Sequence, residues 1–355
     1  MKIGLTFNVR LAKQVRQPES FDLPARRTGQ LALPGDDQDE EFDSPETIQA
    51  LASVLESFGH EVELLGDGEP LLRRLIDGER PDLVWNFAEG TGGGRSREAR
   101  VPAVLEMLGI PYTGSDPLTL AATLDKDCAK RLVAQRGAAT PPWVLFAGDW
   151  NAAEAELASL DFPVFVKPAF EGSSKGILTA SIIHDLAQLK QALAELVNVY
   201  RQPVLVETFI DGDELTVGMV GNQSPEILGI MRVLPREALA GPFVYSLEVK
   251  RDWQRLVRYE CPAQLTPQDT EAVRQAALAC WQALGCRDVS RFDFRLRDGV
   301  AYFLEVNPLP GLSPHSGDLV ILSGQMGLEY PELVAKILQA ALERLNLVHE
   351  ISLVE

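Results

Sequence analysis

The chain has 355 residues, which is too long for one compact core and enough for two or three lobes with a cleft between them. Its formal net charge of −18 repels phosphate backbones and anionic lipid headgroups, which excludes nucleic acid and membrane surfaces as expected partners. The 46% of hydrophobic and 24% of charged residues are typical of a folded globular protein, so a bound polyanion would need locally clustered lysines or metal ions.

Strands and helices alternate in the first third of the chain, which predicts a parallel α/β lobe over residues 1–116. Short apolar runs predict the strands, and apolar residues at three- and four-residue spacing predict the helices. In chain order we expect a strand at 2–8, a helix at 44–58, a strand at 60–65, a helix around 73–76, a strand at 82–86, and a helix at 101–108 that ends at Gly109.

Residues 11–43 interrupt this alternation with a segment rich in Arg, Gln, Asp, Pro and Gly that has no usable periodicity. Five of the six residues at 36–41 are acidic. A long loop of this kind is either a solvated surface excursion or a functional lid or interface arm. We assign it no chemistry from the sequence.

Two further lobes are expected, a central lobe over residues 117–202 and a last lobe over residues 203–355. For the central lobe the patterns predict a helix at 118–137, strands at 143–146, 161–168 and 177–180, a helix at 185–197, and a closing strand at 204–209. For the last lobe they predict strands at 215–220 and 226–233, an excursion at 244–257, a helix at 267–284, a hairpin at 291–307, and a helix at 330–345.

The predicted hairpin at 291–307 is apolar and aromatic, yet it contains Asp293, Glu305 and Asn307. Charge is costly in such strands unless it is paired or bound to a metal, and two carboxylates with an amide suit Mg²⁺. A two-residue loop at Asp298–Gly299 would place the two carboxylates on opposite faces, whereas a three-residue loop would pair them directly. A shared metal ion therefore predicts a loop of odd length. The alternative is an exposed edge hairpin with a solvated acidic face.

The segment Glu171–Gly176, just after Lys167, is a turn rich in glycine and serine between two expected strands. Small residues there let backbone N–H groups approach phosphate oxygens while a lysine supplies positive charge. The alternative is a tight hairpin with no ligand. Residues 206–210, followed by Asp211–Glu214, place an aromatic ring and carboxylates at another strand end, which suits either the edge of an adenosine or an ordinary strand and turn.

Taken in order, five passages resemble the D-alanine–D-alanine ligase family of ATP-grasp enzymes. They are LEMLGIPYTGSDPLTLAATLDK (105–126), FPVFVKPAFEGSSKG (162–176), VLVETFIDGDELTV (204–217), SRFDFRL (290–296) and FLEVNPLPGLSPHS (303–316). The resemblance covers roughly the last two thirds of the chain. It implies an ATP-grasp fold, α/β with an α+β last lobe, behind an N-terminal parallel α/β pre-ATP-grasp lobe.

The resemblance also implies roles for individual residues. The phosphates of ATP would lie near Lys126 and Lys167, under a loop that includes Glu171, Ser173, Ser174 and Gly176. The adenine and ribose would be framed by Glu207, Thr208, Phe209, Ile210 and Glu214. Two Mg²⁺ ions, with Mn²⁺ as an alternative, would be held by Asp293, Glu305 and Asn307. Arg291 and Gly311 would face charge that develops in the reaction, Ser316 would contact the second substrate's carboxylate, and Lys250 would belong to a closing loop.

Departures from the family are concentrated in the first lobe. The family's first-substrate elements are absent, and Asn86–Gly90 and Gly94–Glu98 stand in their place. Arg95, Arg97, Glu98 and Arg100 either bind a carboxylate or amine other than D-alanine or are surface charges at a helix start. The resemblance therefore implies the ATP chemistry and leaves the first substrate open.

We expect an ATP-dependent ligase that joins small amino-acid-like substrates, a carboxylate and an amine, through an acyl-phosphate. The alternatives are a ligase for another amino acid pair or a natural-product amide, and a nucleotide-binding regulatory module without turnover. Arg291 together with all three metal-ligand positions favours catalysis. The resemblance further implies a homodimer formed through the first lobe. With no signal-peptide core and no apolar run of 18 residues, a cytoplasmic location is expected.

Overall fold

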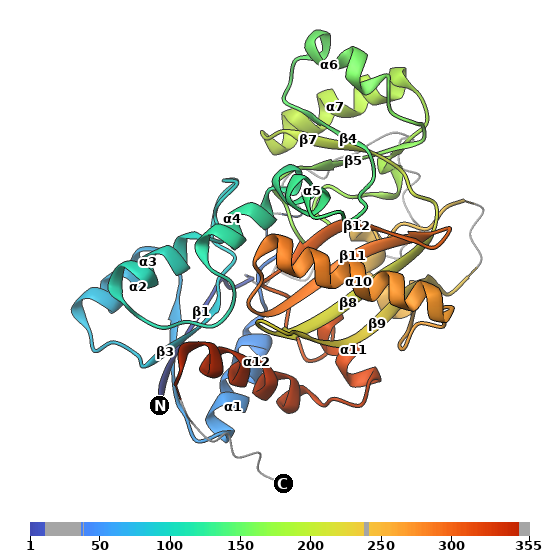
Figure 1. The fold of residues 1–355 in the computed structure, drawn as a ribbon. Helices are drawn as coiled ribbons and strands as arrows, with labels where there is room; N and C mark the ends of the chain where they lie inside the picture. The colour runs from blue at the N-terminus through green and yellow to red at the C-terminus, as the bar shows by residue number, and fades with distance from the viewer. Residues whose placement is uncertain (11–36, 38, 238–240, 348–355) are drawn as a thin grey trace, which may run out of the picture.

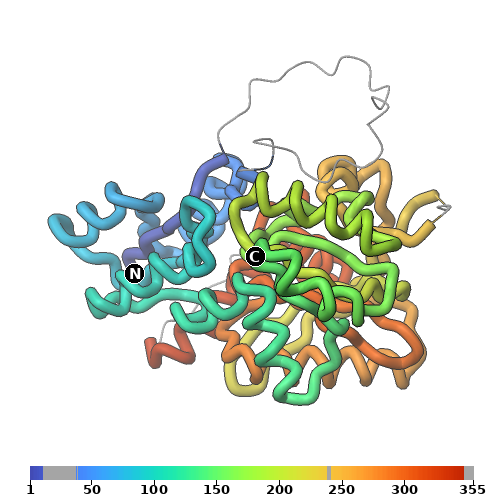
Figure 2. The backbone as a smooth tube through the Cα atoms, turned by 90° about the horizontal axis from the view of Figure 1, so that it is seen from above, coloured from blue at the N-terminus to red at the C-terminus, as the bar shows by residue number. Residues whose placement is uncertain are grey.

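The computed structural model describes residues 1–10, 37, 39–237 and 241–347. Three β-sheets organise this part of the chain (Figure 1). Seen from above, the first lobe lies to one side of the other two (Figure 2). Every helix within the described ranges is too short or too polar to cross a membrane.

The first lobe is a parallel α/β unit, as predicted. Its strands are β1 (Lys2–Phe7), β2 (Glu61–Gly66) and β3 (Leu83–Phe87), in the order β2-β1-β3. Its helices are α1 (Pro45–Ser57), α2 (Gly68–Asp77) and α3 (Arg100–Leu108). Local sequence sets the helix ends, because the Ser44 hydroxyl accepts from the Thr47 N–H at the start of α1 and Gly109 ends α3 in the left-handed conformation.

The central lobe begins with two helices where the sequence predicted one. Asp125 ends α4 (Pro117–Leu124), and its carboxylate caps α5 (Lys126–Gln135) by accepting from the Cys128 N–H. The new helix starts at Lys126, so this lysine lies in the first turn of α5.

The central sheet is antiparallel and has the order β4-β7-β5-β6. Its strands are β4 (Trp143–Phe146), β5 (Val164–Pro168), β6 (Ile182–Ile183) and β7 (Val204–Thr208), and the helices α6 (Trp150–Leu157) and α7 (Leu186–Tyr200) cover one face (Figure 1). Because β7 pairs with β4 and β5, this sheet extends past the expected lobe boundary at residue 202.

The predicted strand at 177–180 is wrong. The segment leads into a 3₁₀ helix, η1 (Thr179–Ser181), because the Leu178 N–H donates to the Ser181 hydroxyl within the turn and not to a neighbouring strand. The helix α6 was not predicted, although the Asp149 carboxylate caps its start.

The last lobe is built on a five-stranded antiparallel sheet with the order β10-β9-β8-β11-β12. Its strands are β8 (Asp213–Gly221), β9 (Glu226–Pro235), β10 (Val257–Glu260), β11 (Asp288–Arg297) and β12 (Val300–Asn307). Its helices are α8 (Leu247–Arg251), α9 (Trp253–Leu256), α10 (Pro267–Leu284), α11 (Asp318–Gln325) and α12 (Tyr330–Leu345). The bounds of α10 and α12 match the prediction, whereas β10 and α11 were not predicted.

The first and last lobes share a hydrophobic core. Leu333 and Ile337 of α12 belong to one buried cluster with Ile3 of β1 and Leu55 of α1. The final helix therefore returns to the beginning of the chain and fixes the first lobe beside the five-stranded sheet (Figure 1).

The hairpin of β11 and β12 corrects the prediction about its loop. The turn has two residues, Asp298 and Gly299, both with positive φ, and the strands pair Arg297 with Val300. A β-bulge then places the extra residue Leu304 in β12, so that Asp293 lies opposite Glu305. The two carboxylates therefore face each other although the loop has even length, because the bulge supplies the odd residue.

Candidate active site

A pocket, here called the inter-sheet pocket, lies between the two antiparallel sheets. The central sheet contributes Lys167, Glu207 and Phe209, and the five-stranded sheet contributes Asp293 and Glu305. A first-lobe pocket continues from Glu305 toward Glu98, and an outer pocket opens beside Ser316. Arg291 lines all three pockets and marks the place where they meet.

Two buried lysines hold Glu207 at the wall of the inter-sheet pocket. Its carboxylate lies 2.6 Å from the Lys130 ammonium and 2.7 Å from the Lys167 ammonium. Burial alone would raise the pKa of Glu207, but the two positive charges lower it. Burial lowers the pKa of Lys130 to about 8 against the opposing effect of Glu207. The Glu207 side chain is thus paired with both lysines at the pocket wall.

Lys130 was missed from the sequence. It lies on the buried face of α5, one turn after Lys126, where an unpaired ammonium would be costly. Two lysines four residues apart on an otherwise apolar helix face were the available signal.

Phe209 and Arg295 form the far end of the inter-sheet pocket. The Arg295 guanidinium lies 5.3 Å from the centre of the Phe209 ring, and it donates to the Glu214 carboxylate over 2.7 Å. Thr208 and Ile210 line the same end, so the predicted adenosine residues come together here. Arg295 was not predicted, although an arginine inside the apolar string SRFDFRL was a signal for a buried partner.

Asp293, Glu305 and Asn307 lie together where the inter-sheet pocket meets the first-lobe pocket. Asp293 accepts from the Thr216 hydroxyl over 2.8 Å and from the Arg291 guanidinium over 2.9 Å. Burial would raise the pKa of Glu305, but nearby cations, Lys126 foremost at 3.5 Å, lower it to about 2. Glu305 is therefore ionised at neutral pH.

A second group of predicted residues surrounds the outer pocket. Arg291 donates to Asp318, the first residue of α11, over 3.1 Å. The Lys250 ammonium lies 4.0 Å from the same carboxylate. Gly311 and Ser316 line the opening between them. Asp318 was missed because α11 was not predicted.

In the loop at Glu171–Gly176, the two serines face the pockets, whereas Glu171 and Gly176 have other contacts. Ser173 and Ser174 adopt positive φ and face the pockets. A Cβ added to Gly176 would lie 2.5 Å from the Pro168 ring, so this glycine is required for packing beneath β5. The Glu171 carboxylate points away from the inter-sheet pocket, since it accepts from the Gln202 amide over 2.7 Å and pairs with Lys175.

Comparison with known proteins identifies the family. The family described as D-ala D-ala ligase C-terminus matches residues 132–339. The D-alanine–D-alanine ligase of Xanthomonas axonopodis is 34% identical over 282 residues, which cover 78% of this chain and 83% of that protein. The chain belongs to the D-alanine–D-alanine ligase family.

The uncharacterized protein y4sG of Sinorhizobium fredii is 35% identical to this chain over 303 residues. The aligned residues make up 83% of this chain and 87% of that protein. The crystal structure of a D-alanine–D-alanine ligase from Bacillus anthracis complexed with ATP superposes with a TM-score of 0.70 at 23% identity. It covers 97% of this chain and 98% of that one, which confirms the predicted ATP-grasp fold. As a family member, the chain is an ATP-dependent ligase that forms carbon–nitrogen bonds.

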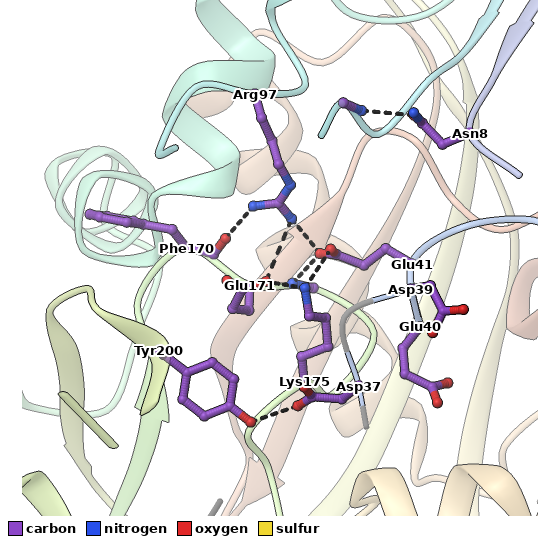
Figure 3. A network of polar contacts seen from close by, with 12 residues as sticks. Asn8, Asp37, Asp39, Glu40, Glu41, Arg97, Phe170, Glu171, Lys175 and Tyr200 are labelled. Carbon is purple, nitrogen blue, oxygen red and sulfur yellow. Dashed lines mark hydrogen bonds and ion pairs between the residues drawn. The ribbon is translucent and has the colours of Figure 1, made fainter. Parts of the chain in front are cut away.

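A buried ionic network stands where this chain departs from the ligase family (Figure 3). Glu41 and Arg97 form an ion pair in which Arg97 is 2% exposed. The Glu41 carboxylate also accepts from the Gly172 N–H over 2.6 Å and lies 3.2 Å from the Lys175 ammonium. The interpretation of Arg97 as a surface charge is therefore wrong, because it joins the first lobe to the loop of the central lobe.

The contacts of Glu41 show where the end of the segment 11–43 lies. Residues 39–43 pack against the cleft and are not a solvated surface segment, whereas 11–36 and 38 lie outside the described residues. The acidic composition of this run was the available signal, but only the fold brings it next to Arg97 and Lys175.

Three further carboxylates line the first-lobe pocket of this ligase. They are Asp43, Glu89 and Glu98. Burial, reinforced by neighbouring carboxylates, raises the pKa of Glu98 to about 8 and that of Glu89 well above its usual range. Burial also raises the pKa of Asp43 to about 7. For Glu98, which is 7% exposed, the alternative of a surface charge is wrong.

Glu98→Gln is expected to stabilise the ligase increasingly as the pH rises. Between its ordinary value of 4.5 and its folded value of about 8, the folded chain retains a proton that the unfolded chain has released. The free energy of unfolding therefore falls with rising pH in this window, by at most roughly 1.4 kcal/mol per unit, and glutamine removes that loss. Urea unfolding of the wild type and of Glu98→Gln at about pH 5 and about pH 8 measures this effect. If the free energies of unfolding of the two proteins differed by the same amount at both pH values, the prediction would be contradicted.

Proposed function

We propose that the chain joins two amino-acid-like substrates by transferring the γ-phosphoryl group of ATP to a carboxylate and then letting an amine displace phosphate. The observation that carries this proposal is the position of Arg291, whose guanidinium meets the inter-sheet, first-lobe and outer pockets at once. A nucleotide, an acid and an amine can thus approach one point from three sides.

The residues of the inter-sheet pocket fit ATP. Lys126 and Lys167 supply positive charge for the phosphates, with Ser173 and Ser174 in the loop beside them. Phe209 and Ile210 supply apolar contact for the adenine, and Glu214 is held by Arg295 within reach of the ribose. Glu207 acts in this proposal by fixing Lys130 and Lys167, and Thr208 lines the adenine edge.

Asp293, Glu305 and Asn307 fit Mg²⁺, with Mn²⁺ as an alternative, because they offer two carboxylates and an amide oxygen on paired strands. No three His, Cys, Asp or Glu side chains in the described ranges are grouped closely enough to hold a metal alone. The remaining ligands are therefore phosphate oxygens and water, and we propose two ions. When bound, Mg²⁺ supplies charge neutralisation at the transferred phosphoryl group.

The protein's own groups then orient the substrates. Arg291, fixed between Asp293 and Asp318, faces the carbonyl oxygen of the acid, together with the backbone of Gly311. Lys250 and Ser316 border the outer pocket and are placed to bind the carboxylate of the amine substrate. Lys250 lies 4.9 Å above the Tyr245 ring, which positions its ammonium over the opening.

The test of this function is release of ADP and phosphate with Mg²⁺-ATP and a panel of D- and L-amino acids, singly and in pairs, with mass spectrometry of the products. We expect ADP, phosphate and a dipeptide-like amide in equal amounts. The names of the relatives favour D-alanine as the first pair to try, whereas the different first lobe favours another acid. ATP binding without turnover across the panel would support a regulatory module instead.

We also propose a homodimer formed through the first lobe. This lobe exposes large apolar side chains at Leu64 of the edge strand β2, Ile76 of α2 and Met107 of α3. Sedimentation equilibrium should give twice the chain mass of 38.9 kDa, and a monomer would contradict the proposal.

A further inference from the structure

The first-lobe pocket has the position expected for the acid that is phosphorylated. It is lined on one side by Glu305, Asn307 and Gly311 and on the other by Glu89 and Glu98. Any molecule in it lies between the proposed metal ligands and the part of the chain that differs from the family. Its wall chemistry therefore selects the acid.

Most of the charges around this pocket are already paired. Glu41 and Glu171 share Arg97 and Lys175, with the Glu171 carboxylate 2.5 Å from the Lys175 ammonium (Figure 3). Glu305 lies beside Lys126. These acids require no ligand to balance them.

Asp43, Glu89 and Glu98 differ from these paired acids in their contacts. In the described part of the chain no hydrogen bond or ion pair is made by the carboxylates of Glu89 and Glu98, and Glu98 is 7% exposed. Burial raises the pKa of Asp43, and the positive charge of Arg10 opposes that effect. The three acids come from separate segments, the end of the excursion, the residues after β3 and the residues before α3, and they line one pocket. Ionising a buried carboxyl that has no partner is costly unless a cation binds beside it.

Within the described residues, Asp43, Glu89 and Glu98 are not grouped closely enough to hold a metal ion as a set of three. Burial raises the pKa values of Asp43, Glu89 and Glu98, so a cation that binds beside these carboxyls favours their ionised forms. The three carboxyls line separate parts of the pocket wall, and a single α-ammonium has only one charge to place among them. An organic cation with two separated charges matches three carboxylates that are spread over the pocket wall.

We propose that the acid substrate of this enzyme is a basic amino acid, whose side-chain ammonium or guanidinium binds among Asp43, Glu89 and Glu98. The proposal rests on the proposed function in that it assigns the first-lobe pocket to the acid. Glu98 is the principal specificity-determining residue, since it is the most deeply buried of the three that lacks a partner.

The probes are matched amino acids that differ mainly by a charged side-chain end: ornithine against norvaline, and lysine against norleucine, each as both enantiomers. Release of ADP with Mg²⁺-ATP is measured for each acid alone and with alanine or serine as the amine. We expect kcat/KM to favour the basic member of at least one pair by about tenfold or more. Glu98→Gln should reduce that ratio by about tenfold. Glu56→Gln, an exposed carboxylate on α1, is the matched control and should leave the ratio unchanged.

Isothermal titration calorimetry with the same acids separates this proposal from the proposed function. If no pair of acids leads to ADP release, the ligase proposal fails. Even then, the pocket assignment is supported if the basic acid binds more tightly than its neutral partner and Glu98→Gln weakens that binding. If the neutral member binds and reacts as well as the basic member in every pair, or if Glu98→Gln leaves the ratio unchanged, the pocket assignment is overturned.

Discussion

Glu305→Gln is expected to lower kcat by on the order of a thousandfold, because several kcal/mol of transition-state stabilisation depend on a carboxylate at this position. Glu305 faces Asp293 across the bulged hairpin and lies 3.5 Å from the Lys126 ammonium. Its pKa of about 2 means that it is ionised throughout the working range, so glutamine removes a full negative charge and one metal ligand. The measurement is steady-state ADP release as a function of Mg²⁺ concentration.

The matched control for this variant is Asp298→Asn in the turn of the same hairpin. The Asp298 side chain is 88% exposed, and asparagine tolerates its positive φ, so kcat should stay within about twofold of wild type. Circular dichroism of both variants checks the fold. If Glu305→Gln retained wild-type kcat at every Mg²⁺ concentration, the metal assignment of Asp293, Glu305 and Asn307 would be wrong.

Asp288→Ala is expected to lower the free energy of unfolding by about 3 kcal/mol, because it leaves a partly buried arginine without its fully buried partner. Asp288 is fully buried and accepts from Nε and Nη2 of Arg344 on α12, over 2.9 and 2.7 Å. It also accepts from the Gly114 N–H over 2.8 Å, and Arg344 donates to the Tyr112 carbonyl. This ion pair therefore joins the five-stranded sheet, the final helix and the connection that follows the first lobe.

Alanine adds a second cost at this position, because Asp288 has a φ of 62° and alanine is disfavoured in the left-handed region. Asp288→Asn keeps the tolerance for that conformation and one acceptor, so its loss should be smaller. Urea unfolding followed by circular dichroism gives both values.

An exposed ion pair on the same helix supplies the contrast. Lys336 of α12 lies 2.7 Å from Glu226, and both side chains are well exposed, so Lys336→Met should change the free energy of unfolding by less than about 1 kcal/mol. Equal losses for Asp288→Ala and Lys336→Met would show that Asp288 does not join the lobes.

The sequence by itself determined the local elements with strong patterns. The helices α10 and α12 and the strand β4 have the predicted bounds, since apolar periodicity, capping residues and flanking prolines act within a few neighbouring residues. The sequence also predicted Asp293, Glu305 and Asn307 as metal ligands and Lys126 and Lys167 as phosphate contacts, because a charge inside an apolar strand must have a partner wherever that strand lies. The structure places these residues around the connected pockets, and their roles stay predictions.

Only the tertiary structure decided which segments meet. The bulge at Leu304 brings Asp293 opposite Glu305 despite an even turn, and strand register cannot be read from a single strand. Lys130, Arg295 and Asp318 join the candidate site through partners on other strands or helices that are distant along the chain. Glu41 reached Arg97 and Lys175 from an excursion without periodicity, and Glu98 proved to be buried instead of exposed at a helix start. Burial and charge pairing are properties of the folded surroundings, so the sequence predicted the ATP-dependent ligase chemistry, and only the tertiary structure placed the buried acidic side chains around the first-lobe pocket.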